Sequence, residues 1–221
     1  METTWQNKLV RDVYQAAAQQ CAPVIFGIKP SNLLTVDRQH ARVLKSLIDA
    51  TGLKARCLDH TTDRQVWFLF REEDLLPLLQ DPANRDFICS YGYSKDMDMD
   101  HMLALLASHF RAYRTQAAVF PHEMGIFLGY PLGDVRGFIE NNGRNYLCSG
   151  YWKVYENEKE ARLTFRRYAN VRKYAMDLIR SGAGFDPVRQ YRRAILKKAD
   201  PERKLFLRQT AAALNGSFSN T

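Results

Sequence analysis

One predicted β-hairpin, set in an otherwise largely helical sequence, constrains the fold of this chain more than any other feature. The extended runs Lys54–Asp59 and Arg64–Arg71 are separated by His60-Thr61-Thr62-Asp63, a tetrapeptide typical of turns. Residues 66–70, Val-Trp-Phe-Leu-Phe, form the most β-prone segment of the sequence. We therefore predict an α+β fold in which this hairpin belongs to a small sheet.

Helical periodicity on both sides of the hairpin predicts the other elements. We expect helices at residues 4–20, 37–51, 72–80, 96–114, 122–128, 132–141 and 156–181, with one or two more between 187 and 213. Further strands are expected at residues 24–28 and 117–120 and within 146–155. The sequence thus predicts a small sheet of about four or five strands flanked by helices, followed by a basic helical C-terminal third.

The positive charge of the chain is concentrated in its last third. Residues 1–150 carry 16 Lys and Arg against 17 Asp and Glu, whereas residues 151–221 carry 16 against 7, so net charges of −1 and +9 give the total of +8. Such a region attracts phosphate, nucleic acid or an acidic partner, or it is simply a solvated helical surface rich in arginine. We divide the chain into an α+β core, residues 1–155, and a basic helical region, residues 156–221, that packs on the core as one continuous domain.

The spacing of the cysteines and the hydropathy of the chain favour a cytoplasmic protein. Cys21, Cys57, Cys89 and Cys148 include no CxxC pair and no cluster at zinc spacing, so we expect reduced thiols and no metal site. The first residues lack the pattern of a signal peptide, and no apolar run approaches the roughly 20 residues of a membrane helix. We therefore expect no membrane contact.

The first unusual segment, residues 21–33, combines a thiol, an amine and a hydroxyl around a short predicted strand. Cys21 precedes this strand, and Lys29 and Ser31 follow it, in loops of the kind that carry reactive groups. Cys21 and Lys29 are candidate catalytic groups, and Ser31 is a candidate ligand-binding group. The alternative is a buried, inert thiol beside a solvated lysine.

The second segment, residues 120–143, is dense in glycine, proline and ionisable side chains. Pro121 is expected to start a helix, so His122 and Glu123 fall in its first turn, where the helix dipole lowers the pKa of a histidine. These two side chains are candidates for a catalytic acid–base pair, or Glu123 merely complements the dipole while His122 packs. Five glycines between residues 125 and 143 indicate close backbone packing or close approach of a ligand.

Part of this segment also resembles a helix-turn-helix. In that alternative, a recognition helix at residues 132–141 offers Arg136 and Asn141 to base edges, and Arg144 is a further nucleic-acid contact. Asp134 and Glu140 oppose this interpretation, because acidic groups that face phosphates lower the affinity for DNA.

The third segment, residues 145–155, is an aromatic run that contains one lysine. Alternation along a strand places Tyr151, Lys153 and Tyr155 on one face and Trp152 on the other. The face with two phenols and an amine suits a pocket for a flat or anionic ligand, but an amphipathic edge strand without a ligand has the same pattern.

Motifs in these three segments match one known family. The matching residues are Cys21-Ala-Pro and Gly27-Ile-Lys-Pro-Ser, Phe120-Pro-His-Glu with the following Gly-Ile-Phe-Leu-Gly-Tyr-Pro and Gly-Phe-Ile, and Gly150-Tyr-Trp-Lys-Val-Tyr. Over about residues 5–175, leaving the basic end outside, the chain resembles the bacterial family labelled domain of unknown function 3793. The family is uncharacterised, so the resemblance implies no activity, cofactor or catalytic residue. Its members occur mostly in anaerobic bacteria, in some cases near flavodoxin and iron-uptake genes, which implies redox- or iron-related work.

Our leading hypothesis is a cytosolic protein or enzyme that binds an unknown small molecule. The pocket combines the 21–33 loop, the helix start at residue 120 and the 150–155 strand. Its polar groups are Cys21, Lys29, His122 and Glu123, and its ligand-binding groups are Ser31, Tyr130, Tyr151, Trp152 and Lys153. One alternative is a nucleic-acid or protein interaction module that uses residues 123–141 and the basic helices, and another is a partner of an acidic, flavodoxin-like redox protein.

Overall fold

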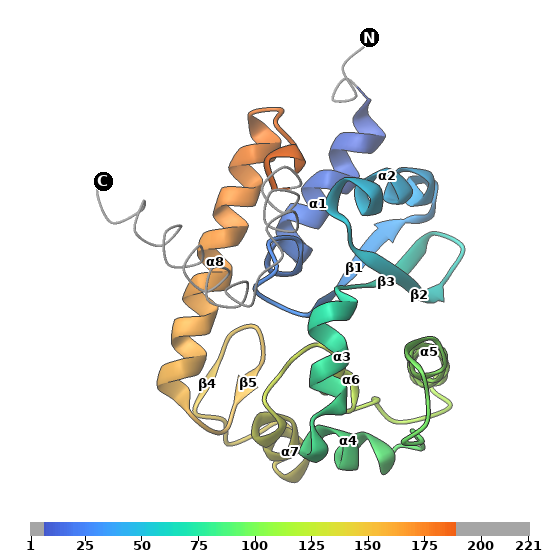
Figure 1. The fold of residues 1–221 in the computed structure, drawn as a ribbon, viewed down its shortest axis with the longest axis vertical. Helices are drawn as coiled ribbons and strands as arrows, with labels where there is room; N and C mark the ends of the chain where they lie inside the picture. Colours follow the sequence, from blue (N-terminus) through green and yellow to red (C-terminus); the bar gives the residue numbers. More distant parts are fainter. Residues whose placement is uncertain (1–6, 189–221) are drawn as a thin grey trace.

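The structure is a computed structural model that describes residues 7–188, and it has the α+β architecture expected from the sequence (Figure 1). Its helices are α1 (Lys8–Ile25), the short 3-10 helix η2 (Arg38–His40), α2 (Ala41–Thr51), α3 (Glu72–Gln80), α4 (Pro82–Cys89), α5 (Met99–Arg114), α6 (Met124–Phe127), α7 (Leu132–Glu140) and α8 (Glu158–Arg180). Its strands are β1 (Ser31–Asp37), β2 (Lys54–His60), β3 (Arg64–Phe70), β4 (Cys148–Ser149) and β5 (Lys153–Val154).

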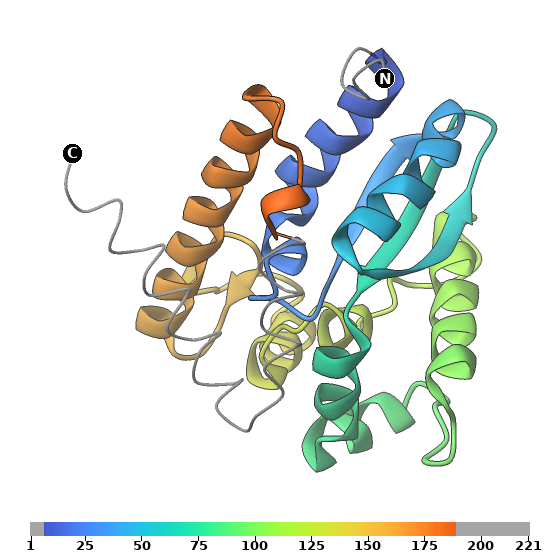
Figure 2. The same ribbon diagram turned by 45° about the horizontal axis from the view of Figure 1, so that its top comes forward.

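A three-stranded antiparallel sheet in the order β1-β3-β2 separates the two main hydrophobic cores. The β-prone strand β3 lies in the middle, where its Phe70 pairs with Ser31 of β1 and with Lys54 of β2. Alternate side chains of β3 enter different cores, Leu69 on one face and Phe68 on the other. Figure 2 shows α2 and α5 on opposite sides of the sheet, so the sheet is buried between two helical layers.

The first core lies between the sheet and helices α1, α2 and α8. Helix α8 runs beside α1 (Figure 1), and its buried Val171, Ala175 and Ile179 belong to the same apolar cluster as the buried residues of α1. The ring of Phe26, at the end of α1, contacts Tyr174 of α8 edge to face at 5.7 Å. The basic helix is therefore part of the main hydrophobic core.

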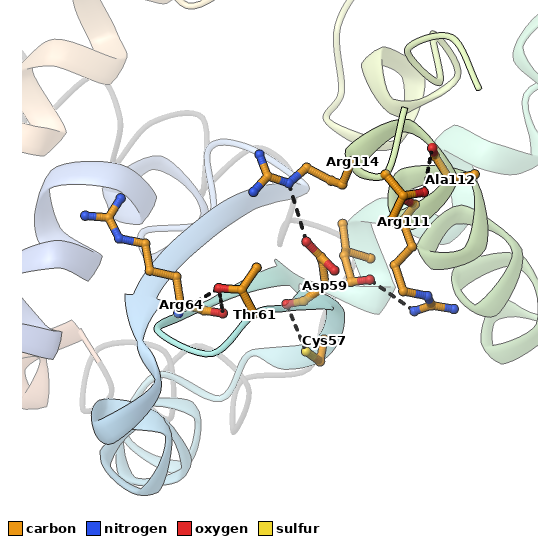
Figure 3. Close-up of polar contacts among 9 residues, drawn as sticks. Cys57, Asp59, Thr61, Arg64, Arg111, Ala112 and Arg114 are labelled. Carbon is orange, nitrogen blue, oxygen red and sulfur yellow. Dashed lines mark hydrogen bonds and ion pairs between the residues drawn. The ribbon is translucent and has the colours of Figure 1, made fainter. Parts of the chain in front are cut away.

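The second core lies on the other face of the sheet and is built from β3 and helices α3 to α7. Polar contacts fix α5 to β2 at a point where the register of that strand shifts between Cys57 and Asp59 (Figure 3). Arg111 donates a hydrogen bond to the Leu58 carbonyl at 3.1 Å, and Arg114 pairs with Asp59 at 3.4 Å. These contacts attach α5 along one edge of the sheet.

The strand predicted at residues 24–28 is wrong, because α1 continues through Pro23 to Ile25. The buried guanidinium of Arg71 donates hydrogen bonds to the carbonyls of Val24 and Ile25 at the end of this helix, and the Val24 carbonyl also accepts from the Gly27 N–H. Gly27 then adopts a left-handed φ of 76° that ends the helix. The strand of this region is β1, which starts only at Ser31.

The remaining elements follow the sequence expectations with three differences. The helix expected at residues 122–128, with His122 and Glu123 in its first turn, begins only at Met124, so both residues precede it. Residues 117–120 form an exposed irregular segment, and the strand expected there is wrong. Residues 146–155 contain the two-residue strands β4 and β5, which pair as a separate hairpin. The helices expected between 187 and 213 lie almost entirely outside the described residues.

The four cysteines are free thiols. Within residues 7–188, no helix combines the length and the apolar character that crossing a bilayer requires.

Candidate functional site

A cavity of about 320 Å³ lies between the 120–130 segment, α7 and the β4–β5 hairpin. Five of its thirteen lining residues carry aromatic rings, in two groups. Phe120, His122 and Phe138 form one group, with successive ring centroids 5.6 and 5.8 Å apart, and Tyr130 stacks on Trp152 at 5.2 Å as a second group. This cavity is lined by three of the five residues predicted to bind a ligand, Tyr130, Trp152 and Lys153, and by one predicted catalytic residue, His122.

The glycines of this region allow its backbone segments to pack closely. A Cβ at Gly125 of α6 would lie 2.7 Å from the Val135 side chain of α7. A Cβ at Gly137 of α7 would lie 2.5 Å from the side chain of Tyr155, which follows β5. Close packing of α6, α7 and the hairpin therefore accounts for these two glycines.

Asp134, in the first turn of α7, fixes the hairpin against this helix. Its buried carboxylate accepts hydrogen bonds from the backbone N–H groups of Tyr155 and Glu156 at 2.7 and 2.9 Å and from Trp152 Nε1 at 2.6 Å. The carboxylate thereby orients the Trp152 ring that forms part of the cavity wall. Sequence reasoning missed this role, because its partners lie 18 to 22 residues away.

Lys153 holds an ammonium group at the cavity. Its Nζ donates a hydrogen bond to the Gly143 carbonyl at 2.7 Å and lies 5.0 and 5.7 Å from the ring centroids of Tyr146 and Phe138. These contacts keep the charged group among aromatic rings, which attract a cation.

The predicted acid–base pair of His122 and Glu123 does not come together. His122 lines the cavity, and burial lowers the pKa of its imidazole despite the opposing charge of Glu123. The fully buried carboxylate of Glu123 instead lies 2.6 Å from Nδ1 of His109, and the hydroxyl of Tyr93 donates to it at 3.5 Å. Glu123 thus connects the 121–123 turn to α5. Its second oxygen, Oε2, has no hydrogen-bond partner in the part of the chain that the structure describes.

Cys21, Lys29 and Ser31 are not part of the cavity lining. Burial raises the pKa of the Cys21 thiol to about 12, against the opposing charge of Lys29, so Cys21 is protonated at neutral pH. The nucleophilic thiolate proposed from the sequence is thereby disfavoured.

Lys29 is 3% exposed, and burial lowers its pKa to about 8. Its Nζ donates to Asn32 Oδ1 at 2.7 Å and lies 5.3 Å from the Tyr130 ring centroid. Lys29 therefore contacts the cavity only through that ring. Ser31 is fully buried, and its hydroxyl donates to the Phe127 carbonyl.

Tyr151 lies outside the cavity, so the strand alternation predicted for residues 151–155 is wrong. Residues 150–152 form the connection between β4 and β5, and a turn does not alternate its side chains as a strand does. Trp152 and Lys153 consequently line the same cavity. Tyr151 contacts Tyr168 of α8 edge to face at 5.0 Å and lines a shallower groove with Phe165, Arg166 and Arg172.

The segment predicted as a helix-turn-helix has a short first helix, and one side chain predicted to contact bases is hydrogen-bonded within the protein. Helix α6 has four residues. On the helix predicted to read bases, the Asn141 amide donates to the Gly137 carbonyl at 2.9 Å and accepts from Asn145. Arg136 and Arg144 are exposed. Among the described residues, no group of three His, Cys, Asp or Glu side chains forms a metal-ligand cluster.

The fold and the cavity define an α+β protein with a small aromatic pocket beside the β4–β5 hairpin. A family model described as a protein of unknown function (DUF3793) matches residues 17–188, and the chain belongs to this family. No curated protein and no solved structure shows a significant match. The match runs beyond residue 175, where the resemblance was expected to end, and α8 with its basic residues lies entirely within it.

Proposed function

We propose that this protein binds a small ligand in the cavity between α7 and the β4–β5 hairpin. The observation that carries the proposal is the convergence of aromatic side chains from separate segments on one cavity of about 320 Å³. Small-molecule sites are concave, mostly apolar and lined by a few placed polar groups. The volume lies at the lower end of the range for such sites, which suits a ligand of one or two rings.

The polar groups that accompany the rings support binding rather than covalent catalysis. His122 and Lys153 line the cavity, and the Ser149 hydroxyl joins them. Cys21, the nucleophile considered from the sequence, lies outside the lining, and burial raises the pKa of its thiol. Four free thiols also support a location in the reducing cytoplasm.

A cavity-blocking variant tests the proposal. Ser149 is exposed at the cavity, so Ser149→Phe fills the space without disturbing a buried core. Ser108 is exposed on α5, away from the cavity lining, so Ser108→Phe is the matched control. A library of one- and two-ring compounds is screened by ligand-observed NMR.

We expect aromatic compounds that bind the wild type and Ser108→Phe but bind Ser149→Phe at least about tenfold more weakly, since the added ring occupies their site. Two results would overturn the proposal. One is that no compound binds the wild type, and the other is that Ser149→Phe binds the same compounds as tightly as the wild type.

A second candidate function, docking of an acidic redox protein, rests on the charge of α8. Between Ala161 and Met176 this helix carries five basic residues and no acidic residue. Arg166 and Arg172 flank the groove of Tyr151 and Phe165. An acidic, flavodoxin-like partner would complement this charge.

Charge reversal tests this second candidate. Association with an acidic flavodoxin should weaken with salt and be lost in the double variant Arg166→Glu/Arg172→Glu. Unchanged affinity would rule out the surface around Arg166 and Arg172 as the docking site. Tighter, salt-sensitive binding to duplex DNA would favour the nucleic-acid alternative instead.

A further inference from the structure

We propose that the ligand of the cavity is a planar aromatic carboxylate, whose ring lies against Tyr130 and Trp152 and whose acid group binds Lys153. This inference rests on the proposed function and adds the chemical class of the ligand. It is carried by the rigidity of the aromatic wall and by the distribution of charge around the cavity.

The wall formed by Tyr130 and Trp152 is preorganised for a flat ring. The two rings stack with centroids 5.2 Å apart and an interplanar angle of 28°. Phe165 of α8 contacts Trp152 edge to face at 4.6 Å, and Asp134 accepts a hydrogen bond from the indole N–H. The hydrogen bond to Asp134 and the contact with Phe165 hold the Trp152 ring in place. The ring therefore loses little conformational freedom when a planar ligand binds, which favours affinity.

The positive charge at the cavity comes from one side chain. Lys153 is the only Lys or Arg among the described residues that line it. The hydrogen bond to the Gly143 carbonyl uses one of the three N–H donors of its ammonium group, so two donors remain for a ligand. The rings of Phe138 and Tyr146 lie 5.7 and 5.0 Å from the ammonium group and keep it at the cavity, where it can meet an anion.

The other ionisable groups at the cavity do not offset this charge. The carboxylate of Asp134 lies in the lining, but its two oxygens accept three N–H hydrogen bonds from Trp152, Tyr155 and Glu156. Those donors stabilise the negative charge and leave it a weak attractant for a cationic ligand.

His122 adds a neutral donor or acceptor to the lining. Burial lowers the pKa of its imidazole, which favours the neutral ring. One cation without a second positive group matches a monoanionic carboxylate better than a phosphate, whose larger charge calls for several donors.

Three probes with the same ring and different charge test the inference. They are 2-naphthoate, the neutral 2-naphthamide and the cationic 2-naphthylmethylamine, titrated calorimetrically into the full-length protein. We expect the wild type to bind the acid roughly tenfold more tightly than the amide, because a hydrogen bond to a charged group adds about that much. The amine should bind most weakly.

Variants of Lys153 and of a control lysine test whether Lys153 causes the preference for the acid over the amide. Lys153→Gln should lower the affinity for the acid to about that for the amide, and Lys153→Arg should retain the preference for the acid. Lys159→Gln, an exposed position of α8 away from the cavity lining, should behave as the wild type. A urea unfolding midpoint close to that of the wild type shows that Lys153→Gln is folded.

The possible failures are distinguishable. Equal binding of acid and amide, tighter binding of the amine, or a preference that survives in Lys153→Gln would overturn the carboxylate assignment, and so would the absence of binding by all three probes. If Ser149→Phe binds these probes as tightly as the wild type, the cavity itself is not their site, and the proposed function falls as well.

Discussion

Two buried ionisable side chains, Glu123 and Lys29, lie next to the cavity without facing into it. Glu123 belongs to a buried group with His109 and Tyr93, and the Nζ of Lys29 lies 5.3 Å from the ring centroid of the wall residue Tyr130. Both were predicted as catalytic groups from their sequence neighbourhood. Their contacts indicate that both side chains stabilise the structure around the cavity.

The contact between Glu123 and His109 should matter strongly for stability. His109→Ala leaves the fully buried carboxylate without its nearest partner, so we expect the free energy of unfolding to fall by roughly 3 kcal/mol. Glu123→Gln should cost less, because a buried amide is neutral. Urea denaturation measures both, and a loss below about 0.5 kcal/mol in His109→Ala would contradict the structure.

The buried amine of Lys29 should give the stability a recognisable pH dependence. Burial lowers its pKa from 10.5 to about 8, so between these pH values the unfolded chain holds a proton that the folded chain has released. Raising the pH then disfavours unfolding. The stabilisation from Lys29 should increase by up to about 1.4 kcal/mol per pH unit in this window.

Comparison of the wild type with Lys29→Met isolates this effect. The thiol of Cys21, whose pKa burial raises from 9.0 to about 12, acts in the opposite direction above pH 9 but is present in both proteins. The difference in unfolding free energy should increase in favour of the wild type as the pH rises through 8 and above. A difference that is independent of pH would show that Lys29 is solvated.

At the scale of elements, the cavity depends on the attachment of the β4–β5 hairpin to α7 through Asp134. Asp134→Ala removes an acceptor from three N–H groups, so the amides of Tyr155 and Glu156 should exchange with solvent faster. We expect a loss of roughly 2 kcal/mol in stability. Asp134→Asn, which keeps one acceptor oxygen, is the intermediate control, and unchanged exchange in Asp134→Ala would contradict this role.

The elements that could be predicted from the sequence are those defined by local signals. The hairpin of β2 and β3 has a turn tetrapeptide between two extended runs, and α2 ends at Gly52, whose φ of 66° is the expected left-handed cap. The strand predicted at 24–28 failed because an apolar run fits a buried strand and a buried helix end equally well. The deciding contact comes from Arg71, 46 residues after Ile25.

The difference between local sequence signals and contacts between distant residues also explains which site residues could be predicted. His122, Tyr130, Trp152 and Lys153 were identified because unusual residues cluster in short segments. Asp134, His109 and Tyr93 were missed as site residues because each acts through a partner more than ten residues away. Residue type and spacing carry no signal of such contacts.

At the scale of the whole molecule, α8 joins the basic region to the main core. Its charge sets this region apart in the sequence, and its buried Val171, Ala175 and Ile179 belong to the core cluster of α1 and the sheet, while the family match includes the whole helix. Residues 1–155 alone would expose that core surface to water.

Truncation tests this dependence. A chain that ends at residue 155 should lose cooperative urea unfolding and bind a hydrophobic dye such as ANS. The full-length chain with Arg166→Ala and Arg172→Ala, which loses charge but no buried surface, should unfold as cooperatively as the wild type. Cooperative unfolding of the truncated chain would instead establish residues 1–155 as an independent domain.

The most direct test of the central claim follows the indole N–H signals of ¹⁵N-labelled protein during titration with 2-naphthoate. Trp152 lines the cavity, whereas the Trp67 indole bonds to Gln65 on β3, away from the cavity lining. Assignment uses Trp152→Phe and Trp67→Phe. We predict that the Trp152 signal shifts to saturation while that of Trp67 stays in place. A Trp152 signal that does not move at saturating probe would contradict a ligand site in this cavity.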